Sequence, residues 1–403
     1  MESAVITDPQ PVGKLEDARI LIYSHDTFGL GHLRRCRTIA HALVDQYKGL
    51  SVLILTGSPI IGRFDFKARV DFVRIPGVIK LHNGEYTSLG LHIDLQDTLK
   101  LRESIILHTA EAFRPDLFLI DKEPLGLKGE VESTLKMLRQ KGVPSVLGIR
   151  DVLDAPHLLK PEWETKQAIP ALDNYYREIW VYGDRAMGNP LSGLDIPESV
   201  QQKIHFTGYL QRDLPEMVQS KHLPPTSEPY ILITPGGGGD GVEMVDWVLR
   251  AYEQSPELSH GLFVLGPFMA LAEQQAFQQR IDQLDNASLL TFDNHMESLM
   301  NSAEAVVAMG GYNTFCEILS FNKRSLLIPR TTPRQEQLIR ALHAQELGLV
   351  SLLDPRDGTS AEAMSHALRE LPQQKLPQQQ MDDDFLQGLV SVNNRTLALL
   401  QGD

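Results

Sequence analysis

The chain has 403 residues, a hydrophobic content of 42% and a formal net charge of −14 at pH 7. This length predicts two or three domains, and the hydrophobic content is typical of a globular protein with buried cores. The acidic balance argues against nucleic acid as a main partner, because such proteins need a basic face, but it permits a local basic pocket for a phosphorylated ligand.

The cysteines and the N-terminal stretch indicate the cellular compartment of the protein. Cys36 and Cys316 lie far apart within helical patterns, so we expect buried thiols in a reducing environment. Residues 1–17 carry acidic residues and prolines without an apolar signal core, and we expect them to be disordered. No run of about 18 apolar residues occurs, so no transmembrane segment is expected. We predict a cytoplasmic protein and leave peripheral membrane contact open.

An apolar strand over 18–25 leads through a glycine-bearing turn into a helix. Gly29 and Gly31 allow a tight turn and close backbone approach to a ligand. His32 and Arg35 follow, one turn apart at the start of the helix. Free N–H groups, an imidazole and a guanidinium suit an anionic or proton-transferring site. The alternative is a turn that needs glycine for packing alone.

Short apolar strands alternate with helical patterns through the first half of the chain. This alternation predicts an N-terminal Rossmann-like α/β domain over 18–210, with a parallel sheet covered on both faces. Ligands bind at the carboxyl ends of such strands. The polar residues at these ends are His25, Asp26, Asp121, Lys122, Glu123, Arg150 and Asp151. For each residue alone, a solvated loop or a helix cap is the alternative. The expected strands are 18–25, 50–56, 70–75, 116–121, 145–149, 178–183 and 203–208.

A polar, proline-rich linker is expected over 211–229, and a second Rossmann-like α/β domain over 230–384. Its first turn, residues 236–241, contains five glycines but lacks the Gly-Lys-Ser/Thr ending of a P-loop. ATP hydrolysis of that kind is therefore not expected. The exposed N–H groups could still approach a diphosphate, and a mobile surface loop is the alternative.

The second candidate binding region is a buried strand that leads into Gly310 and Gly311. We expect Thr314 to cap the next helix, with Glu317 completing a capping box, which alone could explain both residues. Asn322 is a suitable left-handed terminator of that helix.

Arg330 follows the next strand, and Gln335, Glu336 and Gln337 lie at a further helix start. Its amide and carboxylate suit sugar hydroxyls, and a solvated helix start is the alternative. The acidic triplet 382–384 is expected to be a solvated loop, and no convincing metal-ligand set occurs. A last helix within 385–403 could return to the N-terminal domain.

These residues resemble the GT-B glycosyltransferases, especially family 28, which includes the N-acetylglucosaminyltransferase that makes the peptidoglycan lipid intermediate. The resemblance rests on residues 29–32 (Gly-Leu-Gly-His), on 310–317, and on 334–337 (Arg-Gln-Glu-Gln). The nearest group is one of predicted bacterial glycosyltransferases of unassigned substrate. With Arg35 and Cys36, the first turn is also similar to the nucleotide-sugar hydrolases of nonulosonic acid biosynthesis.

The resemblance implies two Rossmann-like domains facing across a cleft and a nucleotide-sugar donor, usually UDP-linked, held mainly by the C-terminal domain. Glu317 would bind the ribose hydroxyls, the second glycine turn the diphosphate, and Glu336 with Gln337 the donor sugar. The residues expected to bind the nucleotide sugar are Gly29, Gly31, Arg35, Gly236, Gly237, Gly238, Gly310, Gly311, Asn313, Thr314, Glu317, Arg330, Glu336 and Gln337.

The implied reaction is metal-independent transfer, with no cofactor beyond the nucleotide-sugar substrate. A helix N-terminus can stabilise the departing diphosphate. His32 would act as general base toward the hydroxyl of a small-molecule, glycan or lipid-linked acceptor, with Asp26 as the reserve base or the group that orients it. A single displacement would invert the anomeric centre.

Two alternatives stay open. The first turn permits a nucleotide-sugar hydrolase or epimerase on the same fold. Because Met309 and Tyr312 depart from the usual family pattern, a non-catalytic nucleotide-sugar-binding protein is the second alternative.

Overall fold

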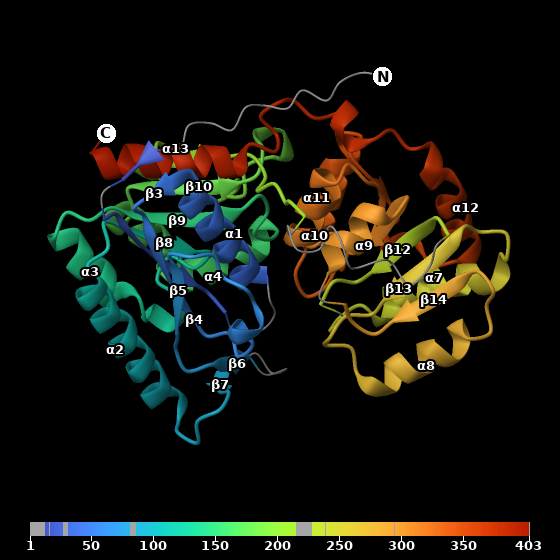
Figure 1. The fold of residues 1–403 in the computed structure, drawn as a ribbon, viewed down its shortest axis with the longest axis horizontal. Helices are drawn as coiled ribbons and strands as arrows, with labels where there is room; N and C mark the ends of the chain where they lie inside the picture. Colours follow the sequence, from blue (N-terminus) through green and yellow to red (C-terminus); the bar gives the residue numbers. More distant parts are fainter. Residues whose placement is uncertain are drawn as a thin grey trace.

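The computed structural model describes residues 13–15, 17–26, 31–80, 86–214, 228–237, 239–293 and 295–402. These ranges form two α/β units side by side, with the last helix lying over the N-terminal unit (Figure 1). The predicted α/β class with two parallel sheets is confirmed. Gly29, Gly238, most of the predicted N-terminal disordered segment and most of the predicted linker lie outside the described residues.

The first unit contains a seven-stranded parallel sheet in the order β11-β10-β9-β8-β2-β4-β5. Chain order reverses between β2 and β8, and a ligand binds at such a switch point in doubly wound folds. The seven expected strands are all present because buried parallel strands read as continuous apolar runs. Their bounds are Arg19–Ser24 (β2), Ser51–Thr56 (β4), Val70–Arg74 (β5), Leu117–Asp121 (β8), Ser145–Arg150 (β9), Glu178–Tyr182 (β10) and Ile204–Phe206 (β11).

Helices cover both faces of this sheet. Along β2, Ile20 and Ile22 join the core under α1, whereas Leu21 and Tyr23 join the core under α2 and α3. This alternation is the period of a strand buried on both sides. The helices are Gly31–Gln46 (α1), Leu95–Phe113 (α2), Glu132–Gln140 (α3), Pro156–Thr165 (α4), Ala168–Tyr175 (α5) and Glu198–Gln201 (α6), with 3-10 turns at Ile61–Arg63, Leu127–Gly129 and Arg185–Met187.

The second unit contains a six-stranded parallel sheet in the order β14-β13-β12-β15-β16-β17, with its switch point between β12 and β15. The strands are Tyr230–Thr234 (β12), His260–Val264 (β13), Ala287–Leu290 (β14), Ala305–Ala308 (β15), Arg324–Leu327 (β16) and Ser351–Leu352 (β17). The helices are Val242–Gln254 (α7), Leu271–Ile281 (α8), Met296–Ser302 (α9), Tyr312–Ser320 (α10), Glu336–Glu346 (α11) and Ala361–Glu370 (α12), and 3-10 turns lie at Pro355–Asp357, Leu371–Gln373 and Pro377–Gln379.

The last helix, α13 (Gly388–Gln401), packs on α1 of the first unit (Figure 1). The Tyr47 hydroxyl donates to the backbone oxygen of Asn393 over 3.1 Å. Arg395 donates to both carboxylate oxygens of Glu178, over 2.7 and 2.8 Å. These contacts bind the C-terminal segment to the N-terminal unit. Among the helices of the described ranges, none has the length and apolar character needed to cross a bilayer.

Several small elements were not predicted, and one cap was predicted wrongly. Helix α10 begins at Tyr312 with Gly311 as its N-cap, so Thr314 lies inside the helix and the expected capping box does not form. The Glu317 side chain instead bonds to Arg34 of the other unit. Asn322 does take the expected left-handed conformation, with φ of 53°. The unpredicted strands are β17 and the pairs Gly13–Lys14 (β1) with Tyr47–Lys48 (β3) and Val78–Lys80 (β6) with Tyr86–Ser88 (β7).

Candidate active site at the domain junction

The switch points of the two sheets contact each other. Asn313, at the start of α10, donates from its side-chain nitrogen to the backbone oxygen of Gly31, over 3.1 Å. Arg212, just after the first unit, donates to Thr38 over 2.5 Å and to the Asn313 side-chain oxygen over 2.9 Å. The predicted residues at Gly31 and Asn313 are therefore brought together, although they are 282 positions apart.

His32 and Asp121 form a pair at the first switch point. The imidazole Nδ1 bonds to the Asp121 carboxylate, and the His32 side chain is 20% exposed while Asp121 is 3% exposed. Asp121 only accepts hydrogen bonds, whereas Arg35 Nη2, 3.1 Å from the same Nδ1, only donates. Because the contact with Asp121 is the shorter of the two, we place the ring proton on Nδ1, and Nε2 keeps its lone pair. Arg35 donates to both oxygens of Asp121, over 2.8 and 2.7 Å. This arrangement presents a neutral imidazole nitrogen that can take a proton.

Arg35 was predicted to bind the nucleotide sugar, yet its guanidinium is buried on Asp121. It also lies 5.5 Å from the centre of the Tyr312 ring, across the junction. Its observed role is to hold Asp121 and to pack the two units together. Asp121 was recognised as a strand-end residue but was not among the predicted site residues, because its partners depend on the strand order.

The electrostatics favour a neutral His32. Burial lowers the pKa of His32 below its usual value of 6.5, against the opposing effect of Asp121. Burial alone would raise the pKa of Asp121, but the Arg35 charge and the hydrogen bonds from His32 and Arg35 hold it well below its ordinary range. The carboxylate therefore stays ionised, and the imidazole is available as a base near neutral pH.

A pH profile should report this pair. Since His32 must be neutral to act as a base and its pKa is lowered, we expect the acid limb of kcat/KM to have its midpoint below pH 6.5. In Asp121→Asn the carboxylate no longer raises the His32 pKa, so the limb should move to lower pH while the maximal rate falls. An acid limb above pH 6.5 in the wild type would contradict this assignment.

Asp26 is close to the same site but faces away from open space. It is buried and accepts from the Thr56 hydroxyl over 2.5 Å, and its other oxygen has no partner among the described residues. Burial raises the pKa of Asp26. His25 is also buried, with its ring 5.7 Å from the His32 ring, and burial lowers its pKa well below the usual value. Of these three groups, His32 is the exposed one.

Glu317, the carboxylate predicted to bind the ribose of the donor, contacts the first unit. Glu317 is 3% exposed, and its Oε1 accepts from Arg34 of α1 over 2.5 Å. The same Arg34 nitrogen donates to Glu297 of α9 over 2.6 Å. Arg34 was not predicted, and no local sequence signal pairs it with Glu317.

The two glycine turns of the second unit lie side by side at its switch point. Gly236 and Gly310 have φ of 83° and 78°, a conformation that glycine adopts without strain. A Cβ atom on Gly236 would lie 3.8 Å from the Thr314 hydroxyl, and a Cβ on Gly311 would meet nothing within 4 Å. Gly237 lies beside Phe268. These turns leave open space before the start of α10.

Arg330 joins the remaining predicted donor-side residues. Its guanidinium donates to Glu336 over 2.6 Å and pairs with Asp240 of the first glycine turn. Its backbone nitrogen donates to the Gln337 side chain over 2.9 Å. Glu336 is 7% exposed, and its Oε2 has no partner among the described residues. The predicted set is thus gathered at one edge of the second sheet.

A buried ion pair that the sequence did not indicate closes the centre of the junction. Arg340 of α11 donates to both oxygens of Asp151, over 2.7 and 2.6 Å, and both side chains are fully buried. Arg340 also donates to the backbone oxygen of Gly310 over 3.0 Å. The Tyr209 hydroxyl donates to Asp151 over 2.6 Å. Tyr209, just before the predicted linker, is therefore packed between the units.

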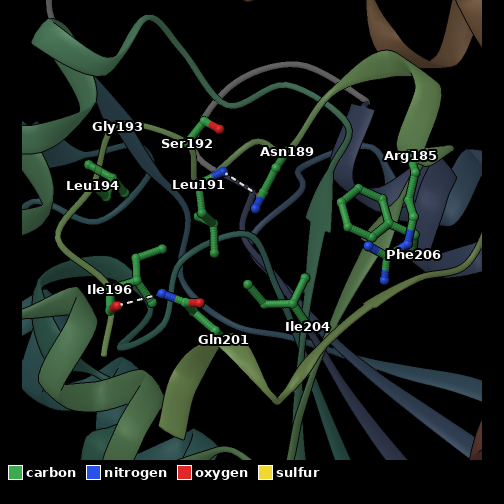
Figure 2. A pocket seen from close by; sticks show the side chains of 10 residues that line it. All are labelled: Arg185, Asn189, Leu191, Ser192, Gly193, Leu194, Ile196, Gln201, Ile204 and Phe206. Carbon is green, nitrogen blue, oxygen red and sulfur yellow. Dashed lines mark hydrogen bonds between the residues drawn. The ribbon is translucent and has the colours of Figure 1, made fainter. Parts of the chain in front are cut away.

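A separate hollow of about 330 Å³ opens on the N-terminal unit. Figure 2 shows its lining, which comes from the segment between Arg185 and Phe206 and contains none of the predicted site residues. The hollow is not part of the junction site.

The C-terminal half has a recognisable family. Residues 245–395 match the family described as the glycosyltransferase family 28 C-terminal domain. This segment is therefore similar to a family 28 domain. This family 28 domain includes α10, Glu317, Arg330 and α11, whereas the glycine turn at Gly236 precedes it.

Two relatives agree with this family. An uncharacterized glycosyltransferase of Methanosarcina acetivorans is 24% identical over 357 residues, covering 85% of this chain and 87% of the relative. The UDP-N-acetylglucosamine–N-acetylmuramyl-(pentapeptide) pyrophosphoryl-undecaprenol N-acetylglucosamine transferase of Pseudothermotoga lettingae is 23% identical over 189 residues, 46% of this chain and 51% of the relative. With the family 28 domain, these relatives place the chain among the glycosyltransferase enzymes.

Solved structures share the whole fold. The calicheamicin glycosyltransferase CalG4 superimposes with a TM-score of 0.60 at 16% identity, covering 96% of this chain and 99% of that one. MurG of Acinetobacter baumannii gives 0.55 at 11% identity, covering 96% and 100%. These similarities establish the two-domain GT-B fold around the family 28 domain, as the resemblance predicted.

Proposed function

We propose that the protein is a metal-independent, inverting glycosyltransferase that moves a sugar from a nucleotide donor, UDP-linked, to an acceptor hydroxyl. The observation that carries the proposal is the His32–Asp121 pair at the first switch point, because it lies against the start of α10 in the family 28 domain. A base and a diphosphate-binding helix end would thus meet at one junction.

The base step follows from the geometry of the pair. His32 Nε2 would remove the proton of the acceptor hydroxyl as that oxygen attacks the anomeric carbon. Asp121 holds the ring through Nδ1 and stabilises the imidazolium that forms. One direct displacement breaks the bond from the sugar to the diphosphate on the opposite face, which inverts the anomeric centre.

The leaving group needs positive charge. Helix α10 begins at Tyr312 with the unsubstituted Gly311 as its N-cap, and no side chain caps it. Its free N–H groups and helix dipole suit a diphosphate, and they can stabilise the developing charge in the role that a metal ion fills in other enzymes. The glycine turns at Gly236 and Gly310 would let the diphosphate approach.

Glu317 is the proposed ribose ligand. A carboxylate accepts hydrogen bonds from two adjacent hydroxyls. In the structure Arg34 donates a hydrogen bond to Glu317 Oε1. The ribose hydroxyls would therefore share this carboxylate with Arg34 or displace the Arg34 side chain from it.

Titration with UDP tests the donor site. In Glu317→Ala we expect UDP to bind about 10- to 100-fold more weakly, since a hydrogen bond to a charged group contributes roughly 1.5–3 kcal/mol. The measurement is calorimetric titration of the full chain. Glu297→Ala is the matched control, because Glu297 pairs with the same Arg34 but lies on α9. Equal UDP affinity in wild type and Glu317→Ala would contradict the proposal.

Nucleotide release distinguishes transfer from hydrolysis. A transferase releases UDP from a UDP-sugar only when an acceptor is present, whereas the nucleotide-sugar hydrolase alternative releases it in water alone. Release without acceptor that is abolished in His32→Ala would favour the hydrolase. Binding of UDP-sugars without any turnover across a broad acceptor panel would favour the non-catalytic alternative.

A further inference from the structure

The carboxyl edge of the first sheet carries a guanidinium without a protein partner. Arg150 is the last residue of β9 and is paired in the sheet with Tyr182 of β10. Within the described ranges its side chain forms no hydrogen bond or ion pair, and its Nε is buried without a partner. A buried charged group is costly unless something pairs with it, which suggests that its partner is a ligand.

Asp151 and Asp121 do not pair with Arg150, because other side chains already occupy their carboxylate oxygens. Both oxygens of Asp151 accept from Arg340, and one also accepts from Tyr209. Both oxygens of Asp121 are taken by Arg35 and His32. Neither of these two carboxylates is therefore free to pair with Arg150.

Lys122 adds a second cation to this edge. It follows β8 directly, its side chain is 27% exposed, and its backbone has φ of 71°, which is uncommon for a residue with a side chain. Its nearest acid is Glu123, at 3.3 Å, but Lys166 donates to that carboxylate over 2.7 Å. Burial and the positive charge of Arg150 lower the pKa of Lys122, as expected for two cations near one another.

The facing domain offers a complementary group. Burial lowers the pKa of Arg150, and the charge of Glu336 in the family 28 domain opposes that effect, yet the two side chains form no ion pair. The Oε2 of Glu336 is buried without a partner, as is Arg150 Nε. A ligand with a negative group for Arg150 and a hydroxyl for Glu336 would satisfy both atoms.

We propose that Arg150 and Lys122 bind an anionic group of the acceptor, a carboxylate or a phosphate, beside His32. The inference rests on the proposed function, because that function places the acceptor on the His32 side of the junction. Arg150 ends β9 and Lys122 directly follows β8, in the first sheet, and His32 lies at the start of α1 in the same unit. Arg150 and Lys122 are therefore the cations on the proposed acceptor side. A guanidinium fits the two oxygens of such a group, and Lys122 adds a mobile point charge.

Inorganic phosphate is the first probe. It is titrated into the full chain saturated with UDP, at low ionic strength, so that the diphosphate position is already filled. Phosphate should bind the wild type, and it should bind Arg150→Gln and Lys122→Gln at least about 10-fold more weakly, the effect of a lost charge-assisted hydrogen bond. Arg356→Gln, which removes an exposed cation paired with Asp354, should match the wild type.

The outcomes separate this inference from the proposed function. Glu317→Ala should weaken UDP and leave phosphate unchanged, whereas Arg150→Gln should do the reverse. No phosphate binding to the wild type, or equal binding in all variants, would overturn the anion site. If UDP does not bind, the same titration of the UDP-free chain still tests Arg150. Should Arg150→Gln fail to fold, as judged by its thermal midpoint, Lys122→Gln carries the test.

A second pair of probes identifies the source of the charge. Methyl glucuronide and methyl glucoside differ only in a carboxylate, and the glucuronide should bind the UDP-saturated wild type at least about 10-fold more tightly. That preference should vanish in Arg150→Gln. The relative affinity for UDP-glucuronate and UDP-glucose should not change in this variant. If Arg150→Gln weakens UDP-glucuronate and leaves the methyl glycosides unchanged, the charge belongs to the donor sugar and the acceptor assignment is wrong.

Discussion

Replacing His32 by alanine is expected to lower kcat by about 10²- to 10⁴-fold, the usual contribution of a general base, while the Kd for UDP stays at the wild-type value. The imidazole is held by Asp121 and partly exposed in the first unit, where we propose that the acceptor binds, whereas the proposed UDP ligands belong to the second unit. The measurement is UDP release from the UDP-sugar that binds, in the presence of an acceptor, together with a UDP titration.

Two further variants make this result specific. Asp121→Asn keeps a hydrogen-bonding side chain but removes the charge that stabilises the imidazolium, so its rate should lie between those of the wild type and His32→Ala. His41→Ala removes a histidine from the same helix, where it packs on Phe66 away from the junction, and its rate should be that of the wild type. A His32→Ala enzyme with the wild-type rate would remove His32 from the mechanism.

The fold was largely predictable because its strands are buried on both faces. β2, β8 and β12 read as continuous apolar runs, and their sequence patterns matched the observed strands closely. The elements that were missed are short. β17 and the β6–β7 pair contain only two or three residues each, too few to produce a periodic signal.

The site was predictable as a set of strand ends and turns, but not as a set of partners. His32 meets Asp121 only because the strand order places β8 beside β2. The spacing of Thr314 and Glu317 predicted a capping box, which does not form. Glu317 instead bonds to Arg34, 283 positions away, and a local pattern contains no information about so distant a partner. Contacts between domains are determined by tertiary packing, and a single sequence does not encode them in its local periodicity.

Removing the carboxylate in Asp151→Ala is expected to destabilise the protein by about 3–5 kcal/mol, because Arg340 would remain buried without a counter-charge. Both side chains are fully buried, and the bond is bidentate. The measurement is the free energy of unfolding in urea, with the thermal midpoint as a second readout. Asp45→Ala is the control, since its pair with Lys67 is exposed and should contribute no more than about 1 kcal/mol.

The double variant Asp151→Leu, Arg340→Met separates stability from function. Replacing a buried ion pair by apolar side chains of similar size is often neutral, so most of the lost stability should return. Arg340, however, also donates to the backbone oxygen of Gly310, in the proposed diphosphate turn. Weaker UDP binding in the restored double variant would therefore show that this ion pair positions the donor turn. If both the stability and the UDP affinity recover fully, Asp151 and Arg340 serve only to hold the two domains together.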